Sequence, residues 1–198
     1  MTERILPKGF FRNNPIEKFS AANISYFKMT VGFEAEIEKM LSEWISTGIT
    51  AERRAHIGEE KQTITALGSA EDIVAFMRTK FDIANQSLLC RKALSMQKQV
   101  IPLMLQRYRT TLQDVFIDTA VQILAQAEKY HAEALLEIYP EIRNPYAKSM
   151  ACFVFGMQHL EQAVPLLLAE YKRMKKEYTK ESLCQGPLLG LYVIYEKM

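Results

Sequence analysis

Cysteine is scarce in this chain, and its cysteines are arranged unlike those of a disulfide framework or a metal site. Among 198 residues there are three, Cys90, Cys152 and Cys184, an odd number with no Cys-x-x-Cys pair. Disulfide-stabilised secreted domains are much richer in cysteine, and zinc or redox motifs place cysteines in close pairs. Because each of the three lies among apolar residues, we expect small buried side chains in a reduced, cytoplasmic protein.

Long apolar runs are missing as well. No stretch approaches the roughly 18 consecutive apolar residues that a membrane-spanning helix needs. The first 25 residues carry Arg4, Lys8, Arg12 and Lys18, but they include no apolar core of the kind that a secretory signal requires. The sequence therefore predicts a soluble protein with no membrane partner.

Catalytic motifs are also absent. The chain holds eight glycines, with no phosphate-binding loop and no Gly-x-Ser-x-Gly turn around a nucleophile. We expect Gly68 and Gly156 to serve turns or close helix contacts instead. The net charge of +2 is too small to indicate nucleic-acid binding by itself. The sequence thus predicts no catalytic residue, no metal and no cofactor, and it favours a protein that is not an enzyme.

What the chain does contain is a helical pattern of apolar residues. Of its residues 48% are hydrophobic, which is enough for a globular core. Between residues 33 and 47 the apolar side chains recur at helical spacing, and charged side chains mostly occupy the other face. No convincing strand-type alternation follows, and the prolines fall near segment boundaries or in positions expected for first helical turns. These patterns predict an all-α fold.

One segment occurs twice in similar form. QVIPLMLQRYR at residues 99–109 and AVPLLLAEYKR at residues 163–173 both place a proline before apolar residues and end in tyrosine and a base. Pro102 and Pro165 are each expected in a first helical turn, where a missing N–H costs nothing. Weaker copies, HAEALLEIYPE and EDIVAFMRTKF, fit a common spacing of about 31 residues. The spacing indicates a structural repeat.

A second series supports the repeat, because an apolar triplet closes the helix expected before each copy. The triplets are Ala66-Leu67-Gly68, Ala93-Leu94-Ser95, Ile123-Leu124-Ala125 and Val154-Phe155-Gly156, at spacings of 27, 30 and 31 residues. The segment CFVFGMQHLEQAVPLLLAEYKR, residues 152–173, resembles a HEAT-type repeat, and the resemblance extends over roughly residues 52–195. It implies a short right-handed α-α superhelix (solenoid) of about four helix pairs. The HEAT-like family includes scaffolds, adaptors, regulators and, in a few branches, DNA-repair enzymes.

The expected architecture is one α-solenoid domain over residues 31–198, preceded by an irregular arm over residues 1–30. A repeat stack must cover its outer apolar faces, so we assign a capping helix to residues 33–47 and a closing helix to about residues 180–196. Four helix pairs fill the repeats, about residues 52–177. Their expected ranges are 52–68 with 71–81, 83–96 with 98–110, 112–126 with 128–141, and 146–157 with 160–177.

Basic residues recur near the C-terminal end of each expected second helix. The candidate binding residues of this zone are Gln106, Arg107, Arg109, Arg143, Lys172 and Arg173, and Arg78, Lys80, Lys175 and Lys176 extend the basic series. The simpler interpretation is that these cations offset the helix dipole and solvate the surface. The alternative is a charged stripe for phosphates or an acidic partner. Acidic residues in the same zone, Glu141, Glu170 and Glu177, weaken that alternative.

Tyrosines recur at the same place in the repeat. Tyr108, Tyr139 and Tyr171 are spaced 31 and 32 residues apart. An aromatic ladder could stack on bases or peptides, as it does in proteins that bind single-stranded nucleic acids. A fixed repeat position is more typical of packing between repeats, and we expect that role.

Two pairs of residues have metal-ligand spacing. Glu128 and His131 match half of the motif found in di-iron bundles, but the chain offers no second copy. His56 and Glu60, four residues apart, lie in the charged run AERRAHIGEEK. We expect helix pairing or solvent exposure for both pairs.

Three functional hypotheses follow. The first is a non-enzymatic binding module or scaffold whose concave face of second helices holds a protein segment or an acidic ligand. The alternative is a nucleic-acid-binding protein, including a glycosylase-like HEAT protein of DNA repair, although Trp44, Asp114 and Asp118 supply no catalytic residue for it. The third, a metal-dependent helical enzyme, depends on Glu128 and His131 alone. The sequence leaves the oligomeric state open.

Overall fold

The structure, a computed structural model, describes Leu6, residues 9–15 and residues 50–196. Within these residues every regular element is an α-helix or a 3-10 helix, and no strand occurs, so the predicted all-α class is confirmed. No helix in this part of the chain combines the length and the apolar composition needed to cross a bilayer. The predicted capping helix over residues 33–47 and most of the predicted arm lie outside the described residues.

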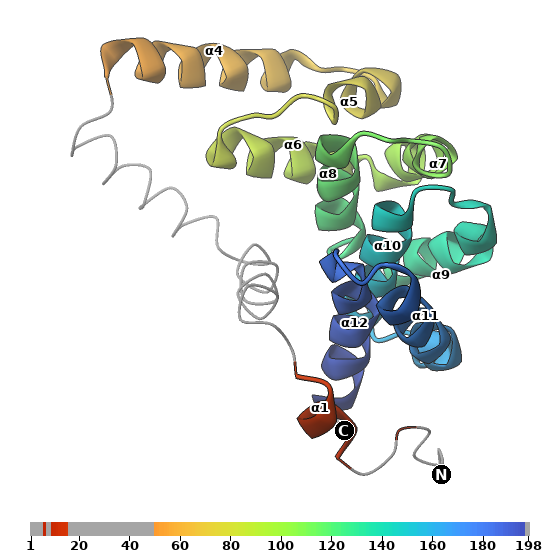
Figure 1. Ribbon diagram of the computed structural model, residues 1–198. Helices are drawn as coiled ribbons and strands as arrows, with labels where there is room; N and C mark the ends of the chain where they lie inside the picture. The colour runs from red at the N-terminus through yellow and green to blue at the C-terminus, as the bar shows by residue number, and fades with distance from the viewer. Residues whose placement is uncertain (1–5, 7–8, 16–49, 197–198) are drawn as a thin grey trace.

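The helices follow one another through short connections (Figure 1). They are α1 (Phe10–Asn13), α4 (Ala51–Ala66), α5 (Ala70–Phe76), α6 (Ile83–Ser95), α7 (Gln97–Tyr108), α8 (Asp114–Leu124), α9 (Lys129–Ile138), α10 (Pro145–Met157), α11 (Val164–Glu177) and α12 (Gln185–Glu196), with 3-10 turns η1 (Tyr139–Glu141), η2 (Glu161–Ala163) and η3 (Ser182–Cys184). Two predicted ranges differ most from the structure: the closing helix α12 begins at Gln185 instead of at about residue 180, and α5 ends at Phe76 instead of at residue 81. There the N–H of Thr79 bonds to the Phe76 carbonyl, and the chain turns before Phe81.

Several helices that are two elements apart in the sequence lie side by side. The first helices of successive pairs contact one another in order, α4 with α6, α6 with α8, α8 with α10 and α10 with α12. Among the second helices, α5 packs against α7. Figure 1 shows the second helices α5, α7, α9 and α11 descending along one side of the molecule. The described helices therefore form two rows joined by their connections.

Side-chain hydrogen bonds join neighbouring pairs at a nearly constant separation along the chain. Lys92 Nζ donates to the Thr65 carbonyl across 27 residues, and Gln86 Nε2 donates to Thr119 Oγ1 across 33. Asn85 donates to the Ile57 carbonyl across 28 residues, and Lys129 donates to the His159 carbonyl across 30. Gln158 donates to the Ala127 carbonyl, and Gln97 donates to Glu128, each across 31 residues. Equivalent parts of successive pairs thus meet repeatedly.

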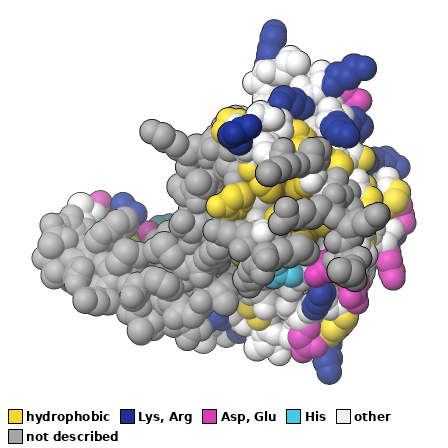
Figure 2. Space-filling model, turned by 90° about the horizontal axis from the view of Figure 1, so that it is seen from below, with side chains coloured by type: hydrophobic (Ala, Val, Ile, Leu, Met, Phe, Trp, Pro, Cys, Tyr) yellow, Lys and Arg dark blue, Asp and Glu magenta, His cyan; other side chains and the backbone are white. Residues whose placement is uncertain are grey.

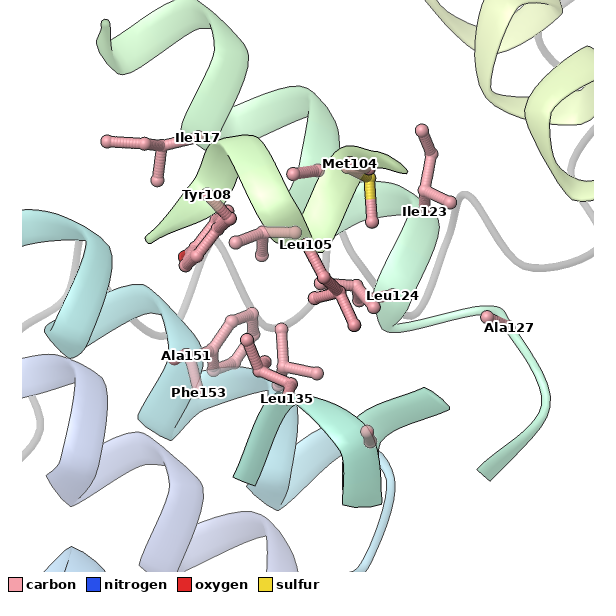
Figure 3. Packing of buried hydrophobic residues seen from close by; sticks show 14 of the residues in the cluster. Met104, Leu105, Tyr108, Ile117, Ile123, Leu124, Ala127, Leu135, Ala151 and Phe153 are labelled. Atoms are coloured by element: carbon pink, nitrogen blue, oxygen red, sulfur yellow. The ribbon is translucent and has the colours of Figure 1, made fainter. Parts of the chain in front are cut away.

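The core runs between the two rows of helices. Helix α8 turns most of its residues inward, including Phe116, Ile117 and Leu124, which are fully buried. Figure 3 shows Leu124 near Leu105 of α7, with Leu135 of α9 and Phe153 of α10 below them. Four consecutive helices therefore contribute apolar side chains to one continuous cluster.

Tyr108 and Tyr139 belong to this cluster, and Tyr171, the third repeat tyrosine, is also buried but lies outside it. Tyr108, Tyr139 and Tyr171 are 0%, 3% and 5% exposed, so the predicted packing role is confirmed and an exposed aromatic ladder is excluded. The hydroxyl of Tyr108 donates to the Ala147 carbonyl at 2.9 Å, and the hydroxyl of Tyr139 lies 3.4 Å from Cys152 Sγ. Each buried phenol therefore keeps a polar partner.

Helices α10 and α12 cross closely at two glycines. A Cβ atom placed on Gly156 would lie 2.6 Å from the carbonyl oxygen of Gly190, which is closer than real Cβ atoms approach. Glycine is needed here because only a residue without a side chain admits the neighbouring backbone. The predicted close contact at Gly156 is confirmed, and Gly68 lies in the α4–α5 connection, where a turn was predicted.

The two repeat prolines occupy different positions. Pro165 lies in the first turn of α11, as predicted. Helix α7 already begins at Gln97, so Pro102 lies inside the helix, and the prediction of a first-turn position is wrong there. Its missing N–H leaves the Lys98 carbonyl without its usual donor, but both residues are exposed and water can take that place.

The predicted irregular arm contains one helical turn, so the prediction is wrong for α1. Gly9 precedes α1 with a φ of 80°, in the left-handed region that glycine enters without steric cost. Asn14 Nδ2 donates to the Phe10 carbonyl at 2.8 Å and closes the turn. The turn is stabilised by contacts with α11 and α12, which the sequence pattern did not reveal.

Candidate binding groove

Gln106 and Arg107 lie in the last turn of α7 and line a groove between α5 and the connection after α7. Further lining residues are Glu71, Val74 and Arg78 on the α5 side, Leu103 of α7, and Thr110, Thr111, Leu112 and Gln113 of the connection. The groove has a volume of about 520 Å³. That volume falls within the roughly 300–1,000 Å³ of typical ligand sites. We call it the α5–α7 groove.

The end of α7 gives the groove its wall. The N–H groups of Thr110 and Thr111 both bond to the Arg107 carbonyl, at 3.2 and 3.1 Å, and the N–H of Gln113 bonds to Thr111 Oγ1 at 3.3 Å. These bonds close a polar turn, after which Asp114 opens α8 with an acidic residue at the positive end of the helix dipole. The sequence after Arg109 therefore places several donors and acceptors at the groove.

The connection after α9 holds this wall from outside the groove. The N–H of Arg143 donates to the Arg109 carbonyl at 3.1 Å, and Asn144 Nδ2 donates to the Thr111 carbonyl at 3.4 Å. The same Asn144 caps α10 by accepting from the N–H of Tyr146 at 2.9 Å. One asparagine thus ties the start of α10 to the groove turn.

Arg107 is the half-buried cation of the groove. Its Nη1 atom is buried and has no hydrogen-bond acceptor among the described residues. Leaving a buried guanidinium N–H without an acceptor destabilises the protein, and a hydrogen bond from the guanidinium to a ligand oxygen would offset that cost. Arg78 adds a second, exposed positive charge, and Glu71 a single negative one. The groove therefore favours a carboxylate or phosphate oxygen beside Arg107.

Two other predicted binding residues are engaged in ion pairs. Arg109 Nη1 lies 3.1 Å from a carboxylate oxygen of Glu141. Arg173 contacts Glu170 and Glu177, each at 2.6 Å, and the hydrogen bond to Glu170 raises the pKa of Arg173 above its ordinary value. Their charges are largely neutralised by these acidic neighbours, which the sequence already placed in the same zone.

The remaining predicted residues lie outside the groove. Arg143 contributes its backbone to the groove wall while its side chain is exposed, and Lys172 is exposed on α11. Figure 2 looks at the end of the molecule where α11 and α12 lie, and it shows Lys and Arg together at the upper part of that face and mixed with Asp and Glu lower down. Of the six candidates, the structure brings Gln106 and Arg107 into one groove.

The polar turn that completes the groove was not predicted from the sequence. The predicted helices 98–110 and 112–126 placed Thr110, Leu112 and Gln113 in helix ends and only Thr111 between them. Leu112 is 78% exposed, which is unusual for a large apolar side chain in the described part of the chain. The sequence does contain a run of two threonines, a leucine and a glutamine at this point, which is typical of a connection between helices. That this connection lines a groove depends on the position of α5, which the run does not reveal.

The metal-ligand pairs do not form a metal site in the described residues, where no group of three His, Cys, Asp or Glu side chains converges. His56 pairs with Glu60 at 3.2 Å on α4, which confirms helix pairing. Glu128 exchanges hydrogen bonds with Gln97. His131 is 4% exposed, and its ring is tilted against the Tyr130 ring with 3.9 Å between centroids. Solvent exposure is therefore wrong for it, because the α9 face that carries it packs inward.

The cysteine thiols offer no nucleophile in the interior. Cys90 and Cys152 are buried, as predicted, and Cys184 is partly buried. Burial raises the pKa of Cys90 and of Cys152 to about 12, so both remain protonated near neutral pH.

Asp118 joins two helices rather than serving as a catalytic acid candidate. It accepts a hydrogen bond from the Tyr146 hydroxyl at 2.6 Å and links α8 to α10.

Comparisons of the chain with models of known families, with curated proteins and with solved structures find no match. The function is therefore inferred from the geometry of the groove.

Proposed function

We propose that α4 to α12 form a short right-handed α-solenoid of HEAT-like helix pairs, and that the protein is a non-enzymatic scaffold. Its α5–α7 groove binds an acidic segment of a partner protein. The stepwise contacts of the first helices support the repeat part of this proposal. The hydrogen bonds at separations of 27 to 34 residues support it as well, because stacked repeats meet at one repeat length.

The observation that carries the binding proposal is the buried Nη1 atom of Arg107, which has no acceptor among the described residues. A carboxylate binds a guanidinium with two parallel hydrogen bonds, and Arg107 presents such a group in the lining of the groove. Gln106 and Thr110 are positioned in the same groove to bond to the backbone of an extended segment. The exposed Leu112 provides an apolar contact for a neighbouring side chain of that segment.

The geometry favours a protein segment over a nucleic-acid strand. A strand needs a continuous cationic track, because each phosphate contributes similarly to binding. Arg109 and Arg173 are paired with carboxylates, and Glu71 places a negative charge within the groove. Arg78 and Arg107 offer two positive charges in the groove against the single negative charge of Glu71, which suits one acidic side chain better than a run of phosphates.

The test is an anisotropy titration with a fluorescein-labelled peptide that contains two glutamates beside a leucine. We expect Arg107→Gln to weaken binding roughly tenfold or more, since it removes a charge-assisted hydrogen-bond donor. Lys98→Gln is the matched control, because Lys98 is exposed on the same helix, does not line the groove and carries the same charge. We expect the control to bind like the wild type.

Three outcomes would count against the proposal. Equal weakening by both substitutions would indicate diffuse electrostatics rather than a site. No binding of the acidic peptide by wild type would remove the support for the groove. If the wild type binds a single-stranded oligonucleotide in a salt-sensitive way, and Arg107→Gln abolishes this binding, the nucleic-acid hypothesis would be favoured instead.

A further inference from the structure

A second interaction surface lies on α11 and α12, away from the α5–α7 groove. It consists of Tyr171 and Lys175 of α11 with Tyr192 and Tyr195 of α12, and we call it the tyrosine surface. Figure 1 shows α1, in red, beside the C-terminal end of α12. None of these residues lines the groove, so the tyrosine surface is independent of the proposed function.

Two adjacent phenylalanines of α1 contact the tyrosine surface. The Phe10 ring meets the Tyr171 ring edge-on, with 5.7 Å between centroids. The Phe11 ring meets Tyr192 edge-on at 5.5 Å and lies 6.5 Å from Tyr195. Edge-to-face packing is a preferred geometry for aromatic pairs, so both rings are well placed.

A polar contact fixes the register of these rings. Asn14 Oδ1 accepts a hydrogen bond from the Tyr171 hydroxyl at 2.6 Å and another from Lys175 Nζ at 3.1 Å. The two donors also bond to each other, with Lys175 Nζ 3.0 Å from the Tyr171 oxygen. Asn14 follows α1 directly and lies four residues after Phe10, so its polar contact and the ring contact of Phe10 come from the same side of the turn.

The bound segment has little structure of its own. Helix α1 has four residues, none of them buried, and helices this short do not form in isolation. Leu6, at 7% exposure, is the additional apolar anchor. The surface, in contrast, is anchored in the core, since α11 buries Leu167 and Met174 and α12 buries Leu191. The surface is therefore preformed, and the segment acquires its shape from it.

We propose that the tyrosine surface is a docking site for partner protein segments that carry two adjacent aromatic residues and a side-chain acceptor one helical turn after the first. The chain's own Phe10, Phe11 and Asn14 occupy this site and compete with the partner. Short amphipathic turns dock on helical surfaces through a few spaced anchors in this way. Covalent attachment gives the resident segment a high effective concentration, so the site is closed to weak ligands.

The experiment opens the site in the full-length chain. The probe is a fluorescein-labelled peptide with the sequence of residues 4–16, RILPKGFFRNNPI. The double variant Phe10→Ala/Phe11→Ala removes both resident rings. We expect it to bind the probe roughly tenfold or more tightly than the wild type, because the tethered competitor is lost. The matched control is Arg12→Ala/Asn13→Ala, which changes two exposed residues of the same turn and should bind like the wild type.

A second probe, with both phenylalanines replaced by alanine, should bind neither protein. Equal affinity of the opened variant and the wild type for the first probe would overturn the proposal. A concentration-dependent dimer of the wild type that the opened variant loses would also overturn it, because the occupant would then be a second copy of the chain. Light scattering after size exclusion distinguishes that case.

A milder variant keeps the test decisive if the opened variant does not fold. Asn14→Leu removes the acceptor for Tyr171 and Lys175 and keeps both aromatic rings. We expect the Asn14→Leu chain to bind the probe more tightly than the wild type does. Unchanged binding by a folded Asn14→Leu chain would contradict the polar part of the proposed recognition.

Discussion

Burial of His131 couples the stability of the fold to pH. The side chain is 4% exposed, and its Nε2 atom has no hydrogen-bond partner among the described residues. Burial lowers the pKa of His131 from its ordinary value of 6.5, and the nearby carboxylate of Glu128 offsets only part of this effect. His131 therefore takes up a proton at a lower pH in the folded state than in the unfolded state.

The sign of the pH effect follows from this difference. The contribution of neutral His131 is fully present above about pH 6.5, the ordinary pKa, and it is lost as the pH falls below that value. We expect the wild type to lose more unfolding free energy than His131→Gln does between about pH 8 and about pH 5 in urea titrations. Equal losses in His131→Gln and wild type would contradict the assignment.

Single-residue roles were predictable where they depend on recurrence. Tyr108 and its repeat equivalents were expected inside because a residue repeated at one position meets the same neighbours each time. The ion pair of Arg109 with Glu141 was not predictable, because it depends on how η1 approaches the end of α7. The groove was missed for the same reason, since Arg78 and Arg107 are separated by a whole helix and meet only after α5 packs on α7.

Two glycines allow a matched test at the level of helices. Gly156 faces the backbone of Gly190 at the α10–α12 crossing, whereas Gly58 lies within α4, where an added Cβ would meet nothing within 4 Å. We expect Gly156→Ala to destabilise the protein by about 1–3 kcal/mol or more, because backbone must move. Gly58→Ala should stabilise it by about 0.5–1 kcal/mol, since alanine favours a helix interior. Equal effects in chemical denaturation would show that the crossing is looser than described.

Helix positions were predictable mainly where local signals mark them. Thr50 and Ser69 cap α4 and α5 through their side chains, and Asn144 caps α10. The position of Pro102 was misjudged because it was assigned by analogy with Pro165, although the helix predicted to begin at residue 98 already placed Pro102 beyond its first turn. Helix α1 could not be predicted, since its four residues fold only against distant parts of the chain.

At the level of the molecule, the sequence predicted the all-helical class and the order of the helices. Apolar periodicity of 3.6 residues and turn signals act locally, so they can be read from one chain. The pairing of α4 with α6 and of α8 with α10 depends on side chains far apart in the sequence. The repeat spacing of about 31 residues predicted such pairing only on the assumption that the chain folds as stacked units.

The burial pattern predicts a gradient of stability along the described helices. One of the 16 residues of α4, Ile64, is buried, whereas α10 buries eight of its 13. Local unfolding free energy rises with buried apolar contact, so a helix with few buried residues opens more readily than a helix with many. Native-state hydrogen exchange read by mass spectrometry should therefore show α4 exchanging through openings of much lower free energy than α10. Ile64→Ala should accelerate exchange in α4 and leave α10 unchanged, whereas equal protection of both helices would mean that the molecule opens only as a whole.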